Sequence, residues 1–146
     1  MTQRKNTILY AEDDLDDLFI LKQAFQQHDH IEVMHAADGK MAIALLETMA
    51  VENMLPCLVI LDINMPVMNG KEALQAIRGH AVLHRLPVVL FSTSSSSSDR
   101  IFAESYQALL VTKPAEFSSL ETIVSQFIER CNFEINNLSV RDPYQN

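Results

Sequence analysis

Short apolar segments alternate with amphipathic ones along most of the chain. Five segments have the length and composition of β-strands, and they are Thr7–Ala11, Ile31–Ala36, Leu58–Leu61, Pro87–Phe91 and Ala108–Thr112. Apolar residues at helical spacing predict five helices, from about Leu18 to His28, Ala42 to Met49, Ala73 to Ile77, Ile101 to Tyr106 and Leu120 to Cys131. This alternation predicts an α/β fold, a doubly wound parallel sheet of five strands with helices on both faces.

The length of 146 residues, without an internal repeat or a linker, predicts one domain. We expect residues 1–131 to form this domain and the polar residues 132–146 to be a C-terminal tail. The hydrophobic content of 48% is that of an ordinary globular protein. A formal net charge of −8 argues against nucleic acid as a direct partner, because phosphate binding needs a basic surface.

The first residues, the apolar runs and the cysteines give no indication of export or of a membrane span. Residues 1–6 lack the apolar region of a signal peptide, and no apolar run reaches membrane-spanning length. Cys57 and Cys131 have no spacing typical of a metal site or a disulfide framework. We therefore expect two buried, unpaired thiols in a reducing compartment, and a cytoplasmic protein with no membrane partner.

The segment Cys57–Gly70 carries the strongest local signal. Its apolar run Leu58–Leu61 has the character of a strand buried on both faces, and Asp62 follows at once. Pro66 and Gly70 then favour a turn, so Asp62 should stand at the carboxyl end of a central strand, where open α/β sheets bind ligands. A helix cap or a solvated loop residue is the alternative interpretation of this aspartate.

Three other strands also end in residues that carry chemistry. Glu12 and Asp13 follow the first strand, Ser92 the fourth and Lys113 the fifth. Because the carboxyl ends of parallel strands share one edge of the sheet, these residues should meet Asp62 there. Adjacent carboxylates raise one another's pKa, and a hard divalent cation such as Mg²⁺ relieves their repulsion.

A lysine and a hydroxyl beside these acids suit an incoming phosphoryl group, with Asp62 as the nucleophile. An ion-paired sheet edge without chemistry is the alternative. The neighbouring Asp14, Asp16 and Asp17 have a simpler explanation, because acidic residues in the first turn of a helix are stabilised by its dipole.

With these residues the sequence resembles the response-regulator receiver domains of two-component signalling, of which the chemotaxis Y protein is a single-domain example. The resemblance spans about Thr7 to Cys131. It rests on four motifs, which are Ala11-Glu12-Asp13-Asp14, Leu61-Asp62-Ile63-Asn64-Met65-Pro66-Val67-Met68-Asn69-Gly70, Ser92 and Lys113-Pro114. It implies a flavodoxin-like fold with strand order 2-1-3-4-5.

The resemblance also assigns roles to the site residues. It implies that Asp62 is the phosphoacceptor, Ser92 the switch hydroxyl and Lys113 the lysine that contacts the phosphoryl group. In this family the peptide bond between the lysine and the following proline, here Pro114, is often cis.

A Mg²⁺ site is implied in the same way. The carboxylates of Asp13 and Asp62 and the backbone carbonyl of Asn64 would bind the ion, and Glu12 would act through water. The resemblance further implies that Asn64 and Ser94, each two residues beyond a site residue, influence the phosphoryl lifetime.

Two positions depart from the family pattern. Leu110 stands where receivers usually have an aromatic residue, and Tyr106-Gln107 stands where they usually have Gly-Ala. Both positions lie in the region that receivers use for output. The resemblance therefore implies an intact phosphorylation site and an altered output region.

The resemblance implies a single-domain response regulator that receives its phosphoryl group from a histidine kinase or a histidine phosphotransfer protein. Output would be contact with a downstream protein target or onward phosphorelay, and the only reactions catalysed would be its own phosphorylation and dephosphorylation. Two alternatives stay open. One is a Mg²⁺-dependent phosphohydrolase of the haloacid dehalogenase class, although such enzymes have an aspartate at the position of Asn64. The other is a scaffold that is never phosphorylated.

Overall fold

A computed structural model of the protein describes residues 5–93, 96–116 and 119–140, with side chains up to residue 132. Five parallel strands form one sheet in the order β2-β1-β3-β4-β5. The strands are β1 (Asn6–Ala11), β2 (Ile31–Ala36), β3 (Leu58–Leu61), β4 (Val88–Ser92) and β5 (Leu109–Thr112). This order confirms the predicted flavodoxin-like fold.

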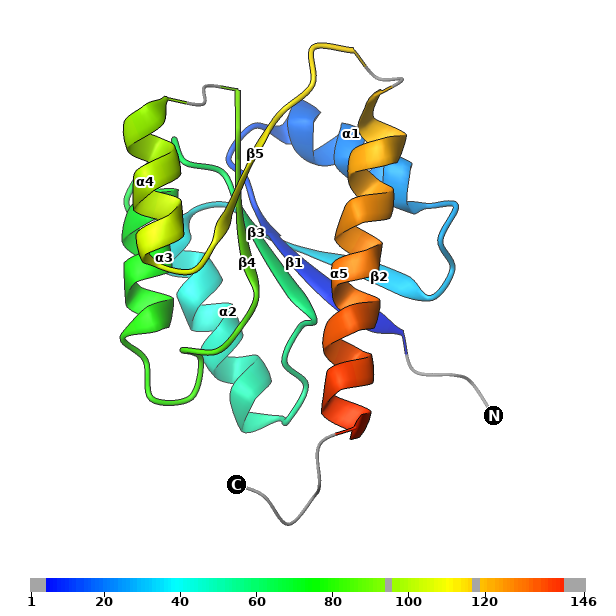
Figure 1. The fold of residues 1–146 in the computed structure, drawn as a ribbon, viewed down its shortest axis with the longest axis vertical. Helices are drawn as coiled ribbons and strands as arrows, with labels where there is room; N and C mark the ends of the chain where they lie inside the picture. The colour runs from blue at the N-terminus through cyan, green and yellow to red at the C-terminus, as the bar shows by residue number, and fades with distance from the viewer. Residues whose placement is uncertain (1–4, 94–95, 117–118, 141–146) are drawn as a thin grey trace.

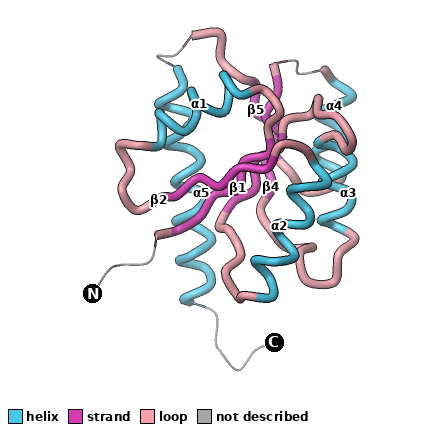
Figure 2. The backbone as a smooth tube through the Cα atoms, turned by 180° about the vertical axis from the view of Figure 1, so that it is seen from behind, coloured by secondary structure: helices cyan, strands magenta, loops and turns pink. Residues whose placement is uncertain are grey.

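Within the described residues, helices alternate with the strands, and they are α1 (Leu15–Phe25), α2 (Gly39–Val51), α3 (Gly70–Arg78), α4 (Ser97–Ser105) and α5 (Leu120–Val140). Helices α1 and α5 cover one face of the sheet, and α2, α3 and α4 cover the other (Figures 1 and 2). The sheet is therefore the middle layer of three, as expected for alternating strands and helices.

The alternation of side chains along the central strands divides the core into two clusters. Leu9 and Leu61 pack toward α2 and α3, whereas Ile8 and Ile60 pack toward α1 and α5. All four side chains are fully buried. Burial of such a side chain stabilises the fold by about 1.5 to 3 kcal/mol. The continuous apolar runs of β1 and β3 thus reflect a sheet that is covered on both faces.

Helices α1 to α4 each begin three or four residues earlier than predicted, and α5 ends later. Helix α4 begins at Ser97, well before Ile101, because the Ser96 hydroxyl accepts a hydrogen bond from the Asp99 amide and caps the helix earlier. Helix α5 continues past Cys131 to Val140, since no glycine or proline interrupts this stretch. The domain limit at residue 131 stays a prediction.

The prediction of two unpaired thiols is wrong. Cys57 and Cys131 form a disulfide, with 4.9 Å between their Cα atoms and a sequence separation of 74. Cys57 directly precedes β3, and Cys131 belongs to the core cluster in which α5 packs against that strand. Their approach follows from the stacking of α5 on the sheet, which sequence spacing does not reveal. The expectation of a cytoplasmic location loses the support of free thiols and stays a prediction.

Two further observations bear on earlier expectations. No cis peptide bond occurs within the described residues, so the bond between Lys113 and Pro114 is trans. No helix in the described part of the chain has the length and apolar character needed to cross a membrane.

Candidate phosphoryl site

Strand β3 delivers Asp62 to the carboxyl edge of the sheet. The Asp62 amide donates a hydrogen bond of 3.0 Å to the carbonyl oxygen of Ala11, which continues the pairing of β3 with β1. The chain then turns tightly, and the Gly70 amide donates to the Ile63 carbonyl at 3.0 Å. A Cβ atom at Gly70 would clash with the Asp62 carbonyl oxygen, so only glycine lets α3 begin this close to the strand. Asp62 itself is 7% exposed.

Strand β1 brings Glu12 and Asp13 beside Asp62. Glu12 is fully buried and Asp13 is exposed. One carboxylate oxygen from each of the three acids lies within 4.8 Å of the others. The Tyr10 hydroxyl donates to Glu12 Oε1 at 2.7 Å, and a ring nitrogen of His35 lies 2.7 Å from the Glu12 carbonyl oxygen. These contacts hold Glu12 in one orientation, and its side chain is more deeply buried than those of Asp13 and Asp62.

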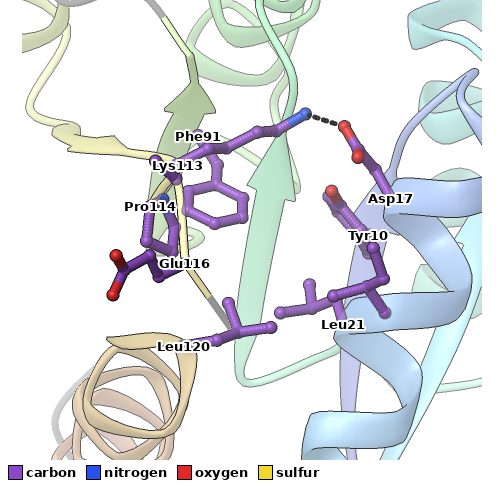
Figure 3. Close-up of a pocket in the computed structure, with 10 residues that line it drawn as sticks. Tyr10, Asp17, Leu21, Phe91, Lys113, Pro114, Glu116 and Leu120 are labelled. Atoms are coloured by element: carbon purple, nitrogen blue, oxygen red, sulfur yellow. Dashed lines mark hydrogen bonds and ion pairs between the residues drawn. The ribbon is translucent and has the colours of Figure 1, made fainter. Parts of the chain in front are cut away.

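Strand β5 places Lys113 opposite the acids. Its amide donates to the Ser92 carbonyl oxygen at 2.8 Å, which aligns the ends of β4 and β5. Its ammonium Nζ lies 2.6 Å from Glu12 Oε1, 2.9 Å from Asp17 Oδ2 and 3.6 Å from Asp62 Oδ2. Figure 3 shows the contact between Lys113 and Asp17, which both line a pocket. Lys113 therefore forms ion pairs with three carboxylates, two of which follow strands β1 and β3 and one of which lies on α1.

Burial and pairing shift the acid–base properties of this cluster. Burial raises the pKa of Glu12, and its hydrogen bond with Asp62 raises that pKa further, although Lys113 and Tyr10 oppose the shift. Burial lowers the pKa of Lys113, but its hydrogen bonds to Glu12 and Asp17 outweigh this effect, and the net pKa is raised. Lys113 is therefore cationic at neutral pH.

The three acids fit a divalent cation. Each supplies an oxygen within 4.8 Å of the other two, and Asp13 and Asp62 reach the surface more than Glu12 does. Hard cations such as Mg²⁺ prefer oxygen ligands of this type and keep several waters. The Asn64 amide lies 3.4 Å from Asp62 Oδ1, so the backbone of Asn64 adjoins the cluster. Its predicted use as a carbonyl ligand stays a prediction.

The structure thus gathers the residues that the sequence placed at strand ends. Ser92 ends β4 and is 1% exposed, next to Lys113. Ser94, expected to influence the phosphoryl lifetime, lies outside the described residues.

Sequence reasoning missed two members of the site. The helix dipole accounts for an acid at Asp17, but the carboxylate of Asp17 is also an ion-pair partner of Lys113. Tyr10 was counted as a strand residue, yet its hydroxyl binds Glu12. A usable signal existed for Asp17, because the first turn of a helix that follows a strand must lie at the carboxyl edge of the sheet.

A pocket of about 220 Å³ adjoins the site between α1 and the beginning of α5. Asp17 and Leu21 border it from α1, and Leu120 borders it from α5 (Figure 3). Phe91 and Lys113 complete its inner wall. Open space therefore lies on one side of the ion pair between Asp17 and Lys113.

Comparison with known proteins identifies the family of the chain. The response regulator receiver domain family matches residues 8–125. The chain is 29% identical over 126 residues to the probable methanogenesis regulatory protein FilR2 of Methanothrix harundinacea, an alignment that covers 84% of this chain and 81% of FilR2. It is 35% identical over 98 residues to the response regulator Rcp1 of Synechocystis sp., covering 64% of this chain and 66% of Rcp1.

Solved structures show the same relationship. The phosphorylated cyanobacterial phytochrome response regulator RcpA aligns with a TM-score of 0.77 at 30% identity, covering 86% of this chain and 92% of RcpA. The Mn²⁺-bound form of Rcp1 aligns with a TM-score of 0.75 at 29% identity, covering 85% and 95% of the two chains. The chain belongs to the response regulator receiver family, whose members accept a phosphoryl group in two-component signalling and are generally not enzymes.

Proposed function

We propose that Asp62 accepts a phosphoryl group from a phosphohistidine on a histidine kinase or a histidine phosphotransfer protein. The observation that carries the proposal is the meeting of Asp62 with two further acids and Lys113 at one strand end. An oxygen of Asp62 forms the new O–P bond while the N–P bond of the donor breaks, and the donor imidazole keeps the electron pair. Such a transfer needs charge neutralisation more than covalent chemistry from the protein.

Each neighbour has a part in this proposal. Glu12, Asp13, Asp62 and the carbonyl of Asn64 would hold Mg²⁺, which when bound neutralises negative charge on the phosphoryl oxygens. Lys113 would pair with a phosphoryl oxygen from the opposite side. The Ser92 hydroxyl, at the end of β4, would hydrogen-bond the added group and so report its presence to the loop that follows.

Two relatives support these assignments. RcpA was crystallised in a phosphorylated form, and Rcp1 in a Mn²⁺-bound form. Mn²⁺ and Mg²⁺ both prefer carboxylate, carbonyl and water oxygens. The acidic cluster of this chain offers that ligand set.

Exposed apolar residues support contacts with two kinds of partner protein, the phosphoryl donor and a downstream target. Leu15 and Phe19 on α1 are 70% and 62% exposed, and they offer an apolar contact for the phosphoryl donor near Asp62. Ile101 on α4 and Leu109 on β5 are 66% and 44% exposed, and they offer a second apolar contact for a downstream protein target. Onward phosphorelay is the other proposed output.

A phosphohydrolase of the haloacid dehalogenase class fits the site less well. Such an enzyme needs a general acid two residues after its nucleophile, and an amide such as that of Asn64 cannot supply a proton at neutral pH. We therefore expect one phosphoryl group bound per chain and no sustained turnover of small phosphate esters.

The test is incubation with acetyl phosphate and Mg²⁺, followed by intact-mass measurement. The wild-type chain should gain the mass of one phosphoryl group, and Asp62→Asn should gain none. Asp16→Asn is the matched control, because it removes one exposed acid near the site and should label like the wild type. Labelling of Asp62→Asn to the wild-type extent would overturn the assignment.

A further inference from the structure

Asp17 contacts the lysine of the phosphoryl site from outside the set of strand-end residues. Among the described residues, three carboxylates lie within ion-pair distance of Lys113 Nζ, those of Glu12, Asp17 and Asp62. The Asp62 oxygen, at 3.6 Å, is the farthest of the three, and the Asp17 oxygen is at 2.9 Å. Lys113 is therefore drawn toward β1 and α1, and away from the carboxylate that would carry the phosphoryl group.

The exposure of the partners decides which contact Lys113 can give up. The Glu12 side chain is fully buried, whereas the Asp17 side chain is 38% exposed. A buried carboxylate left without its cation is strongly destabilising, but an exposed one is hydrated again at little cost. When Lys113 turns to a new anion, Asp17 is the partner that it can leave.

The pocket beside the ion pair gives Asp17 room to separate. Its space of about 220 Å³ lies between Asp17 on α1 and Leu120 on α5, and Lys113 lines its wall (Figure 3). No packed side chain has to be displaced for the carboxylate and the ammonium to move apart on this side. The α1 backbone need not move, since Asp17 can change its rotamer alone.

We propose that Asp17 is a positioning residue that holds Lys113 in the unphosphorylated protein and releases it when a phosphoryl group arrives at Asp62. The inference rests on the proposed function of Asp62. Because a phosphoryl group brings about 1.5 to 2 negative charges, it competes with the Asp17 carboxylate for the same ammonium. Asp17 thus weakens phosphoryl binding, and its removal strengthens it.

The experiment measures the affinity of beryllofluoride, a non-covalent phosphoryl mimic, by ¹⁹F NMR or calorimetry at saturating Mg²⁺. Asp17→Asn should bind the mimic about 2- to 5-fold more tightly than the wild type, the range expected for loss of a partly exposed ion pair. Asp16→Asn removes the same charge from the same turn of α1, and Asp16 is not among the partners of Lys113. Its affinity should stay closer to that of the wild type.

A second comparison separates positioning from a general effect on the fold. In a Lys113→Met background, Asp17→Asn should leave the affinity unchanged, because the cation for which the two anions compete is gone. If thermal unfolding shows that Lys113→Met does not fold, the comparison of Asp17→Asn with Asp16→Asn still tests whether Asp17 competes for Lys113.

Several outcomes would overturn the inference. Weaker binding by Asp17→Asn would show that Asp17 holds Lys113 in a productive position, and equal gains in Asp16→Asn and Asp17→Asn would show long-range charge alone. A gain that persists without Lys113 would exclude competition. If the wild type binds beryllofluoride and Asp17→Asn binds it equally, only this inference fails. If the wild type does not bind it at all, the proposed function fails as well.

Discussion

Two cationic side chains lie at opposite edges of the sheet, and they have different kinds of partner. Lys113, at the carboxyl edge, contacts three carboxylates. Arg78, at the end of α3 near the amino edge, bonds backbone carbonyls that precede β4 and β5, those of His84, Leu86, Tyr106 and Gln107. The partners raise the pKa of Lys113, whereas burial lowers the pKa of Arg78.

The difference lies in what the partners can do. Of the carboxylates around Lys113, that of Asp17 is 38% exposed and is free to rotate, and the proposed function adds a phosphoryl group at Asp62, so the contacts of Lys113 can change. The carbonyls around Arg78 belong to the main chain, and they hold the turn before β5, where Gln107 has a positive φ of 56°. The disulfide between Cys57 and Cys131 adds a covalent bond before β3. Contacts at the amino edge therefore fix the strands in place, whereas the ion pairs of Lys113 at the carboxyl edge can rearrange.

The largest effect expected at the amino edge follows removal of the disulfide. A cross-link between residues 74 apart restricts the unfolded chain, and its loss should lower the free energy of unfolding by about 4 kcal/mol. Urea unfolding of a Cys57→Ser, Cys131→Ser double variant measures this change. Dithiothreitol should destabilise the wild type similarly and leave the variant unaffected. Loss of beryllofluoride affinity in the folded variant would contradict the separation of the two edges.

Substitution of Arg78 should have the next largest effect. Arg78→Ala leaves the carbonyls of Leu86 and Tyr106 without a donor, and we expect unfolding free energy to fall by about 3 kcal/mol. Arg78→Lys should restore little, because an ammonium cannot reproduce the planar fork. The exposed Arg85 is the control, and Arg85→Ala should change stability by less than about 0.5 kcal/mol in the same urea titration.

The smallest effect concerns an ion pair between the first turns of α3 and α4, neither member of which is an ion-pair partner of Lys113. Asp99 pairs with Lys71, and this hydrogen bond lowers the pKa of Asp99 below its usual value of 3.8. A lowered folded-state pKa stabilises the protein above pH 3.8 and loses this contribution as pH falls through the folded-state value. The stability difference between wild type and Asp99→Asn should therefore be present at pH 7 and should be lost as the pH falls through the lowered folded-state pKa of Asp99.

That pH dependence is measured by urea unfolding from pH 7 to pH 2.5. Beryllofluoride affinity at pH 7 should be the same in Asp99→Asn and in the wild type, because Asp99 does not contact Lys113. A stability difference that stays constant down to the lowest pH would show that Asp99 acts by packing and not by charge.

Local patterns along the chain were sufficient for most of the fold. The run Leu58–Leu61 followed by Asp62 identified a central strand and the acidic residue at its end, because a strand buried on both faces needs an uninterrupted apolar run. The rule that parallel strands share a carboxyl edge then brought Glu12, Asp13 and Lys113 to the same place. Helix ends were less well predicted, because side-chain caps such as that of Ser96 begin helices before their first apolar residue and no helix breaker ends α5 at Cys131.

The order of elements and the identity of the strand-end residues follow from local sequence, because both depend on neighbours within a few positions. Contacts between distant side chains become visible only in the folded molecule. The contact of Asp17 with Lys113 joins residues 96 apart, and the disulfide joins residues 74 apart. Such contacts depend on how α1 and α5 rotate and stack on the sheet, which is set by packing of the whole core and has no signature in local periodicity.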